Sequence, residues 1–273
     1  MIYNKAAYLM SLSLLFALIF VSSAGLAEEK QELTVFSGAG LTGAMSEIAG
    51  IYENSSNVSV KFNFDGVPAL RAQIEQGAYA DVLVSANLKH MNALKSEGLM
   101  DNQSVVIFVH NKVAIIIPNN NPANITVLQD LAAPGVKIIM GTKDLPAGDY
   151  ALQVLDKLAA DPEYGPAFKE SVLANVVSLE TTVNRVVSKV ALGEADAGFA
   201  FISDVSPQMV GKVTKIYIPD RYNVVGDFPV GVLAQSKNKE QAQAFIDVIM
   251  SDEGQAILDK YGFVPVNVPA KKE

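Results

Sequence analysis

Short apolar runs rich in β-branched residues alternate along the chain with longer segments of helical periodicity, and this alternation is the strongest constraint on the fold. The runs have the length of buried strands and span residues 33–36, 58–64, 82–85, 113–117, 137–140, 197–201 and 213–218. Helices are predicted over 42–54, 69–76, 88–97, 150–160, 182–192, 239–249 and 252–261. Because strands that alternate with helices pair mainly in parallel, we expect an α/β protein with two mixed, largely parallel sheets flanked by helices.

Residues 1–27 have the pattern of a secretory signal. Lys5 precedes an apolar run over residues 6–21, and the small residues Gly25 and Ala27 come just before the first acidic side chains. The run is shorter than the roughly 20 residues that a helix needs to cross a bilayer. We therefore predict cleavage after Ala27 and export across the cytoplasmic membrane, to the periplasm or the cell surface. An uncleaved N-terminal anchor is the alternative.

The formal charge of −8 argues against nucleic acid as a partner, because nucleic-acid binding requires clustered basic side chains. It does not exclude an anionic ligand, since backbone N–H groups inside a cleft can bind an anion locally. The chain has no cysteine, which excludes disulfides, thiolate metal sites, a cysteine nucleophile and a lipid-modified cysteine.

The first predicted strand leads into a glycine-rich turn, residues 37–45, with the sequence Ser-Gly-Ala-Gly-Leu-Thr-Gly-Ala-Met. Ligands of open parallel sheets bind beyond the carboxyl ends of the strands, so the turns that follow strands are where a site is expected. Amides at the start of the next helix can bind an anion, and Ser37 and Thr42 offer hydroxyl donors. A tight turn in which Thr42 only caps the helix is the alternative.

Gly38, Gly40 and Gly43 also match the spacing of a dinucleotide-binding turn, and Asp65 follows at the end of the second predicted strand. Against an NAD site stands the export signal, because nicotinamide cofactors are scarce outside the cytoplasm. The segment before the apolar run also lacks the twin arginines that direct export of folded, cofactor-loaded proteins. An exported enzyme or NAD-binding protein remains an alternative, and we expect no cofactor.

Three further turns that follow strands, residues 65–71, 141–150 and 180–185, also lead into predicted helices. Each places backbone N–H donors at a helix N-terminus. Several such helix starts around one crevice can hold a fully ionised dianion by hydrogen bonds alone. The pattern therefore favours a tetrahedral oxyanion as the ligand.

Residues 33–45, 70–86, 146–151 and 260–264 resemble the periplasmic molybdate-binding proteins of ABC importers. The most specific pieces are Leu-Arg-Ala-Gln-Ile-Glu-Gln-Gly-Ala-Tyr-Ala-Asp-Val-Leu-Val-Ser-Ala and Pro-Ala-Gly-Asp-Tyr-Ala, the second and third of these segments. The resemblance covers nearly the whole chain after the signal. It implies a type II periplasmic binding protein with a ligand cleft between two lobes. Lobe 1 would comprise residues 28–111 plus 227–273, lobe 2 residues 112–226, and strands would cross between them near 111–114 and 226–230.

In the family that the chain resembles, two serines, a tyrosine and two backbone amides hold the anion. Ala147 and Val183 match the positions of the two amides. Gly40 stands in the place of the first serine, Val67 or its neighbour Gly66 in that of the second, and Phe201 in that of the tyrosine. Three hydroxyls are therefore missing, although the backbone N–H groups remain. Ser37 or Thr182 could supply a hydroxyl. The candidate anion-binding residues are Ser37, Gly40, Val67, Ala147, Val183 and Phe201.

Archaeal relatives in this family ligate the metal of tungstate or molybdate through two carboxylates, and the matching positions here hold Leu145 and Val183. The nearby Asp149 and Glu180 are interpreted as surface residues, because a carboxylate beside a bare dianion is repulsive. We therefore expect molybdenum to be bound only as its oxyanion, with no direct metal ligand.

The resemblance implies a monomeric solute-binding protein that captures molybdate, or tungstate, and delivers it to the membrane permease of an ABC importer. We expect no catalytic residues, because the chain has neither a Gly-x-Ser-x-Gly nor a His-Glu-x-x-His motif. Its two histidines, His90 and His110, are interpreted as structural. A binding protein for a different small anion is the remaining alternative.

Overall fold

A computed structural model of the chain describes residues 30–205 and 209–266, and the predicted signal over residues 1–27 lies outside them. The described residues from Glu32 onward belong to one compact unit. The strands of the described part are β1 (Gln31–Gly38), β2 (Val58–Asp65), β3 (Val82–Val84), β4 (Val106–Pro118), β5 (Ile138–Gly141), β6 (Val176–Glu180), β7 (Ala197–Phe201), β8 (Val213–Tyr217), β9 (Val225–Val232) and β10 (Val264–Pro265). They join in the order β2-β1-β3-β9-β4-β7-β5-β6, with β8 and β10 also pairing with β4.

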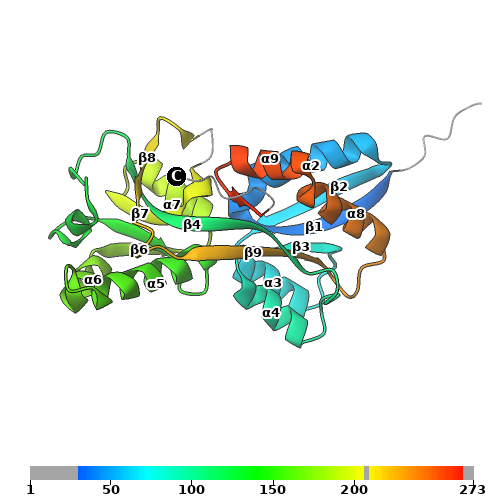
Figure 1. Cartoon of the computed structure of the whole chain (residues 1–273), viewed down its shortest axis with the longest axis horizontal. Coiled ribbons are helices and arrows are strands. Elements are labelled where there is room, and N and C mark those ends of the chain that lie inside the picture. The colour runs from blue at the N-terminus through cyan, green and yellow to red at the C-terminus, as the bar shows by residue number, and fades with distance from the viewer. Residues whose placement is uncertain (1–29, 206–208, 267–273) are drawn as a thin grey trace, which may run out of the picture. The chain divides into compact units, whose positions relative to one another are not determined.

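Helices cover both faces of this sheet (Figure 1). They are α2 (Thr42–Ser55), α3 (Val67–Glu75), α4 (Leu88–Ser96), α5 (Pro146–Ala160), α6 (Gly165–Ala174), α7 (Val183–Ala191), α8 (Lys239–Met250) and α9 (Asp252–Lys260), with short 3-10 turns η1 (Ala39–Leu41), η2 (Leu128–Ala132) and η3 (Ile202–Asp204). Each helix expected from the sequence is present, and α6 is an addition. Helix α5 begins four residues earlier than expected, because Pro146 is preset for the first helical turn.

The mixed pairing of the sheet has a simple origin. Parallel pairs join β1 to β3, β5 to β6 and β5 to β7. The antiparallel pairs all involve β4 or β9. The alternating pattern predicted only residues 113–117 of β4 and did not predict β9 as a strand, so the sheets are less parallel than the sequence alone indicated.

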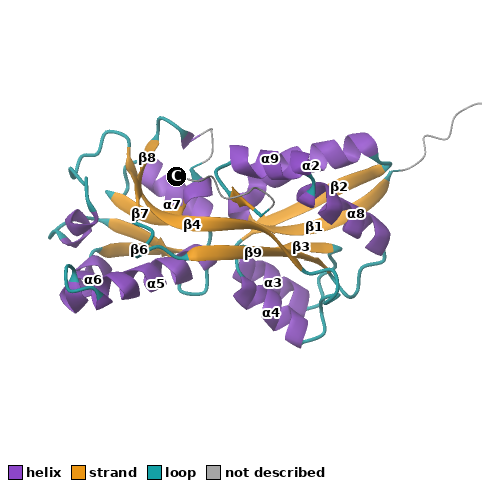
Figure 2. Ribbon diagram, viewed as in Figure 1, coloured by secondary structure: helices purple, strands orange, loops and turns teal. Residues whose placement is uncertain are grey.

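Strand β4 belongs to both ends of the sheet, as Figure 2 shows. Its first part pairs with β9, from Val106 to Lys112. Its second part pairs with β7 and β8, from Val113 to Pro118. We call β1, β2 and β3 the first strand group, and β5, β6, β7 and β8 the second. The two groups are continuous through β4, and the lobe boundaries given above remain a prediction.

Apolar side chains on the covered faces form the core. Helix α7 illustrates the local rule, because its buried residues Val183, Val186, Val187 and Val190 recur at helical spacing and make one apolar stripe.

None of the helices in the described part of the chain combines the length and the apolar composition that a membrane span requires.

A buried carboxylate ties the first strand group to the loop before α8. Asp81 is fully buried, and its Oδ2 accepts a hydrogen bond from the Thr34 amide at 2.8 Å. Its Oδ1 accepts hydrogen bonds from the Tyr79 hydroxyl at 2.6 Å and the Ser236 hydroxyl at 2.7 Å. Because the buried Ser236 hydroxyl and two partly buried donors share this one side chain, its loss would leave them without this acceptor.

We expect Asp81→Leu to lower the free energy of unfolding by about 3 kcal/mol, because unpaired buried donors keep their full desolvation penalty. Urea unfolding followed by circular dichroism measures this change. Asp247→Asn, on the exposed face of α8, is the control and should leave stability nearly unchanged. Equal midpoints for the two variants would contradict this account of Asp81.

Candidate functional site

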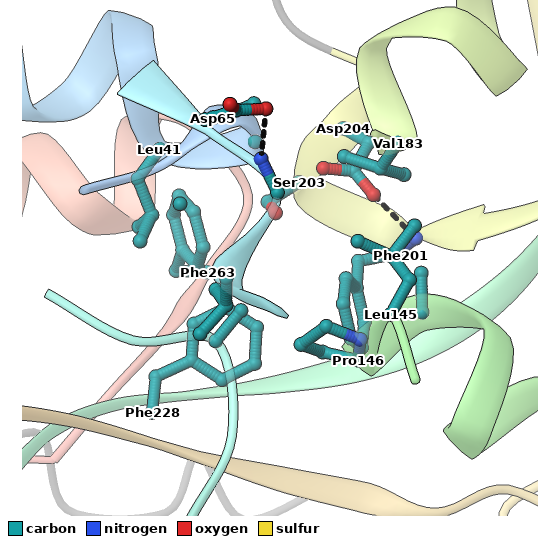
Figure 3. Close-up of a pocket in the computed structure, with 17 residues that line it drawn as sticks. Leu41, Asp65, Leu145, Pro146, Val183, Phe201, Ser203, Asp204, Phe228 and Phe263 are labelled. Atoms are coloured by element: carbon teal, nitrogen blue, oxygen red, sulfur yellow. Dashed lines mark hydrogen bonds between the residues drawn. The ribbon is translucent and has the colours of Figure 1, made fainter. Parts of the chain in front are cut away.

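A small cavity of about 30 Å³ lies where several loops that follow strands meet. Its wall includes the glycine-rich turn after β1, the starts of α3, α5 and α7, and η3 after β7. Phe228 of β9 and Phe263 complete it (Figure 3). The cavity therefore lies at the carboxyl ends of strands, where the sequence placed the site.

Three helices begin at the cavity wall without a side-chain cap. The residues before them are Gly66 for α3, Leu145 for α5 and Thr182 for α7, and none of these side chains accepts a hydrogen bond from the helix. The first N–H groups of a helix have no acceptor within it, and they carry the positive end of the helix dipole. The cavity is therefore surrounded by backbone donors suited to an anion.

The structure brings together most of the residues predicted to bind the anion. Gly40, Val67, Ala147, Val183 and Phe201 all line the cavity. Their convergence from distant parts of the chain follows from the order of the strands, because Phe201 is the last residue of β7 and the others follow strands β1, β2, β5 and β6.

Ser37 does not line the cavity. It lies within β1, opposite Val84, and is fully buried. Its hydroxyl oxygen has no hydrogen-bond partner. Of the two residues suggested as replacement hydroxyls, neither Ser37 nor Thr182 is part of the wall of the cavity.

Two polar residues in the cavity wall, Ser203 and Asp204, were not predicted individually. Both belong to η3, directly after β7, so the general rule about turns after strands was the available signal. The Ser203 hydroxyl accepts a hydrogen bond from Asn111 Nδ2 at 2.8 Å. A hydroxyl that accepts can still donate its own proton, so Ser203 offers a hydrogen bond to a ligand.

The carboxyl group of Asp204 is buried without a cationic partner in the described residues. Its Oδ2 accepts a hydrogen bond from the Phe201 amide at 2.7 Å. Burial raises the pKa of Asp204 to about 7, and the Phe201 amide opposes this shift only in part. Near neutral pH the group is therefore present in both its neutral and its charged form.

Gly40 leaves the space that the Asp204 carboxyl group fills. A Cβ atom built on Gly40 would lie 2.4 Å from Asp204 Oδ1 and 3.1 Å from Val183 Cγ1. The first distance is far shorter than a van der Waals contact, so a serine at position 40 could not coexist with Asp204 in its present place.

One side of the cavity is aromatic. The Phe201 ring packs edge-on against Tyr150, with ring centroids 5.7 Å apart, and against Phe228 at 5.2 Å. Phe228 in turn contacts Phe263 at 6.0 Å. Burial raises the pKa of Tyr150 to about 12, so its hydroxyl stays neutral. The Phe201, Phe228 and Phe263 rings give this part of the cavity wall an apolar surface.

The described residues that line the cavity include no lysine, arginine or histidine. The acidic residues in its wall are Asp65 and Asp204, and Asp65 Oδ1 accepts a hydrogen bond from the Gly66 amide at 2.7 Å. An anion in this cavity would therefore be held by neutral donors and not by opposite charge.

The two acids that were interpreted as surface residues, Asp149 and Glu180, have different surroundings. Glu180 was expected at the surface, but it is buried and forms an ion pair with Lys189. Hydrogen bonds from Lys189 and then Ser178 hold the pKa of Glu180 below its usual value. Asp149 accepts a hydrogen bond from exposed Gln153. Neither acid lines the cavity.

The geometry does not favour a dinucleotide at the glycine-rich turn. A Cβ on Gly43 would lie 2.4 Å from the Tyr261 ring, so this part of the turn is already covered by the chain itself. The cavity of about 30 Å³ is also far smaller than the several hundred Å³ typical of pockets for larger organic ligands.

We expect Gly40→Ala to destabilise the protein by about 1–3 kcal/mol, because the added methyl group must displace the Asp204 carboxyl group from the Phe201 amide. Gly50→Ala is the matched control, since a Cβ at Gly50 in α2 meets nothing within 4 Å. That control should be neutral or slightly stabilising. Urea unfolding compares the two variants. Equal stability would show that the Asp204 carboxyl group can move away without lowering the free energy of unfolding.

Similar proteins of known sequence include molybdate-binding proteins. The chain is 29% identical over 243 residues to the molybdate-binding protein ModA of Mycobacterium tuberculosis, covering 89% of this chain and 88% of that protein. It is 27% identical to a putative ABC transporter substrate-binding lipoprotein of Bacillus subtilis, covering 86% of this chain and 87% of that protein. The resemblance seen in the sequence is thereby confirmed.

Solved structures show the same fold. The substrate-binding domain of a putative molybdenum ABC transporter from Clostridium difficile has a TM-score of 0.65 and 29% identity, covering 86% of this chain and 99% of that one. The Azotobacter vinelandii periplasmic molybdate-binding protein gives 0.73 at 21% identity, with coverages of 87% and 99%. The sulfate-binding protein SubI of Mycobacterium tuberculosis gives 0.76 at 18%, with coverages of 87% and 88%. The fold is that of type II periplasmic binding proteins.

A family model for bacterial extracellular solute-binding proteins matches residues 33–264, a range that contains every element around the cavity. The match extends from β1 to β10 and includes the glycine-rich turn that a dinucleotide site would have required. The chain therefore belongs to the family of bacterial extracellular solute-binding proteins.

Proposed function

We propose that the protein captures a tetrahedral oxyanion, molybdate or tungstate, in the cavity beneath α3, α5 and α7 and delivers it to the permease of an ABC importer. The observation that carries the proposal is the meeting of three uncapped helix starts at one small cavity whose described wall has no basic side chain. Such a set of donors suits an anion that remains fully ionised in water.

The donors supporting the proposal come from the backbone. The amides of Val67, Ala147 and Val183 lie in the first turns of α3, α5 and α7, at the cavity wall. The Ser203 hydroxyl adds a side-chain donor that the family pattern did not indicate. Backbone amides are fixed in direction by the helices, so they need little reorganisation when the anion binds.

The relatives support an oxyanion but differ in which one. The protein of Mycobacterium tuberculosis at 29% identity is named for molybdate, whereas a structural neighbour with the same fold is named for sulfate. We favour molybdate or tungstate because the sequence similarity is greater to the molybdate-binding proteins. A different small anion is the second candidate, and the aromatic wall of Phe201, Phe228 and Phe263 would favour one with an apolar part.

Two further contacts suggest how capture would be signalled. Asn184 Nδ2 donates a hydrogen bond to the Ala39 carbonyl at 3.0 Å, and His90 Nε2 lies 2.8 Å from the Asp144 carbonyl oxygen. The first contact joins the turn after β1 to α7, and the second joins α4 to the loop between β5 and α5. In our proposal, residues 28–111 plus 227–273 and residues 112–226 are two lobes that close on the anion, and the permease recognises the closed form of the exported monomer.

Isothermal titration of the protein without residues 1–27 should show one site for molybdate or tungstate and much weaker binding of sulfate. Size would discriminate the ions, because the donors around a closed cavity fit one ion radius best. NAD is the control for the glycine-rich turn and should give no heat. Absence of binding by every oxyanion would refute the proposed ligand class, and binding of a small organic phosphate instead would favour the second candidate.

Val183→Pro should weaken molybdate binding by about 10–100-fold, because it removes one amide donor to a charged ligand. Proline is well tolerated at the first position of a helix, and Thr182 before it is extended, with φ −135° and ψ 145°. Val183→Ala is the matched control: it shortens the side chain, keeps the amide and should bind nearly normally.

Asp149→Asn is a second control in the same titration, since Asp149 lies in the first turn of α5 but not in the cavity wall. It should leave molybdate affinity close to that of the unmodified protein. Equal losses in Val183→Pro and Asp149→Asn would contradict the assignment of backbone donors.

A further inference from the structure

We propose that Asp204 binds the oxyanion as a neutral carboxylic acid and donates a hydrogen bond from the place where the resembling family carries a serine side chain. The inference rests on the proposed function, because it assigns a further specificity-determining residue to the same cavity. It concerns a residue in η3, beyond the amide donors at the helix starts.

The position of the carboxyl group carries the argument. Asp204 Oδ1 lies 2.4 Å from the point at which a Cβ of residue 40 would stand, so it occupies the space from which a serine hydroxyl would extend. Oδ2 is held by the Phe201 amide at 2.7 Å, which fixes the orientation of the group. Figure 3 shows this bond and the second oxygen directed away from Phe201.

The charges around Asp204 explain why the neutral form is the one that binds. Asp65 lines the same cavity, so it adds a second acidic group and no compensating cation. On the other side Lys215 Nζ reaches the Ile202 carbonyl at 3.4 Å, and the Tyr261 hydroxyl donates to Glu47 at 3.1 Å. None of these groups pairs with the Asp204 carboxyl group, so an ionised Asp204 would face the anion without compensation.

A proton on Asp204 removes this repulsion and replaces it with a hydrogen bond. Because burial already raises the pKa of Asp204 to about 7, the proton is available near neutral pH. A bound dianion favours the neutral form still further. Binding at higher pH is then coupled to protonation: the carboxylate, one proton and the anion combine, and the neutral carboxyl group donates its O–H to an anion oxygen.

The coupling fixes the sign of the pH dependence. Above about pH 7 each further pH unit should lower the affinity about tenfold, until the pKa of the bound state is reached. Below that pH the affinity should be nearly constant. Titration of molybdate between about pH 6.5 and pH 9, in two buffers of different ionisation enthalpy, measures both the slope and the number of protons taken up.

Asp204→Asn is the decisive variant, because its side-chain amide can donate to the anion while its carbonyl oxygen accepts from Phe201. We expect it to bind molybdate independently of pH, with the affinity that the unmodified protein has at the acid end of the range. Asp204→Ala, which has neither a donor nor a charge, should also bind independently of pH but more weakly than Asp204→Asn at every pH. Asp65→Asn is the matched control and should keep the pH slope whatever its affinity.

Thermal unfolding without ligand tests the same carboxyl group independently. A pKa raised on folding means that stability is lost as pH rises from the ordinary value of 3.8 to about 7. Asp204→Asn should therefore melt at a higher temperature than the unmodified protein at pH values well above 7, and not at values near 4. Equal melting differences at both ends would overturn the assignment of the raised pKa.

The outcomes separate the two proposals. If the unmodified protein binds molybdate with no pH dependence, or if Asp204→Asn keeps the slope, the role of Asp204 is refuted and the oxyanion site stands. If no oxyanion binds at any pH, the proposed function itself fails.

Discussion

Helix starts without a side-chain cap are the constraint on which the rest of the site depends. Helices α3, α5 and α7 point the same electrostatic pole at one cavity, and no side chain of the preceding residue relieves them. Like poles brought together repel, so this arrangement is less favourable empty than filled. A ligand with negative charge removes the conflict, and no basic side chain in the described wall adds further positive charge.

The sheet supplies the rigidity that such a site needs. The parallel strands β1, β5 and β7 end at the cavity, so the loops that follow them are anchored at one side by a hydrogen-bonded ladder. The antiparallel strands β4 and β9 hold the two strand groups together. The turns can therefore be short and rich in small residues, because their positions are set by the strands and not by their own contacts.

Much of the fold and most of the cavity could be predicted from the sequence, because buried strands and helix starts leave periodic patterns. The apolar pattern missed the first half of β4 because His110, Asn111 and Lys112 interrupt it, and it missed β9 because that strand contains Gly226 and Pro229. Only the family resemblance indicated strands near 111–114 and 226–230. Asp204 was missed for another reason. Its burial and its raised pKa arise from η3 folding against Gly40, a contact between residues distant in sequence that no local pattern encodes.

Asn111 lies where β4 leaves its pairing with β9, and its side chain reaches the Ser203 hydroxyl of the cavity at 2.8 Å. The same side chain accepts a hydrogen bond from the Lys112 amide at 3.0 Å. One residue thus bonds both to the backbone of the shared strand and to a potential ligand donor. Asn111 therefore links the backbone of the strand that both strand groups share to the orientation of a hydroxyl group in the cavity wall.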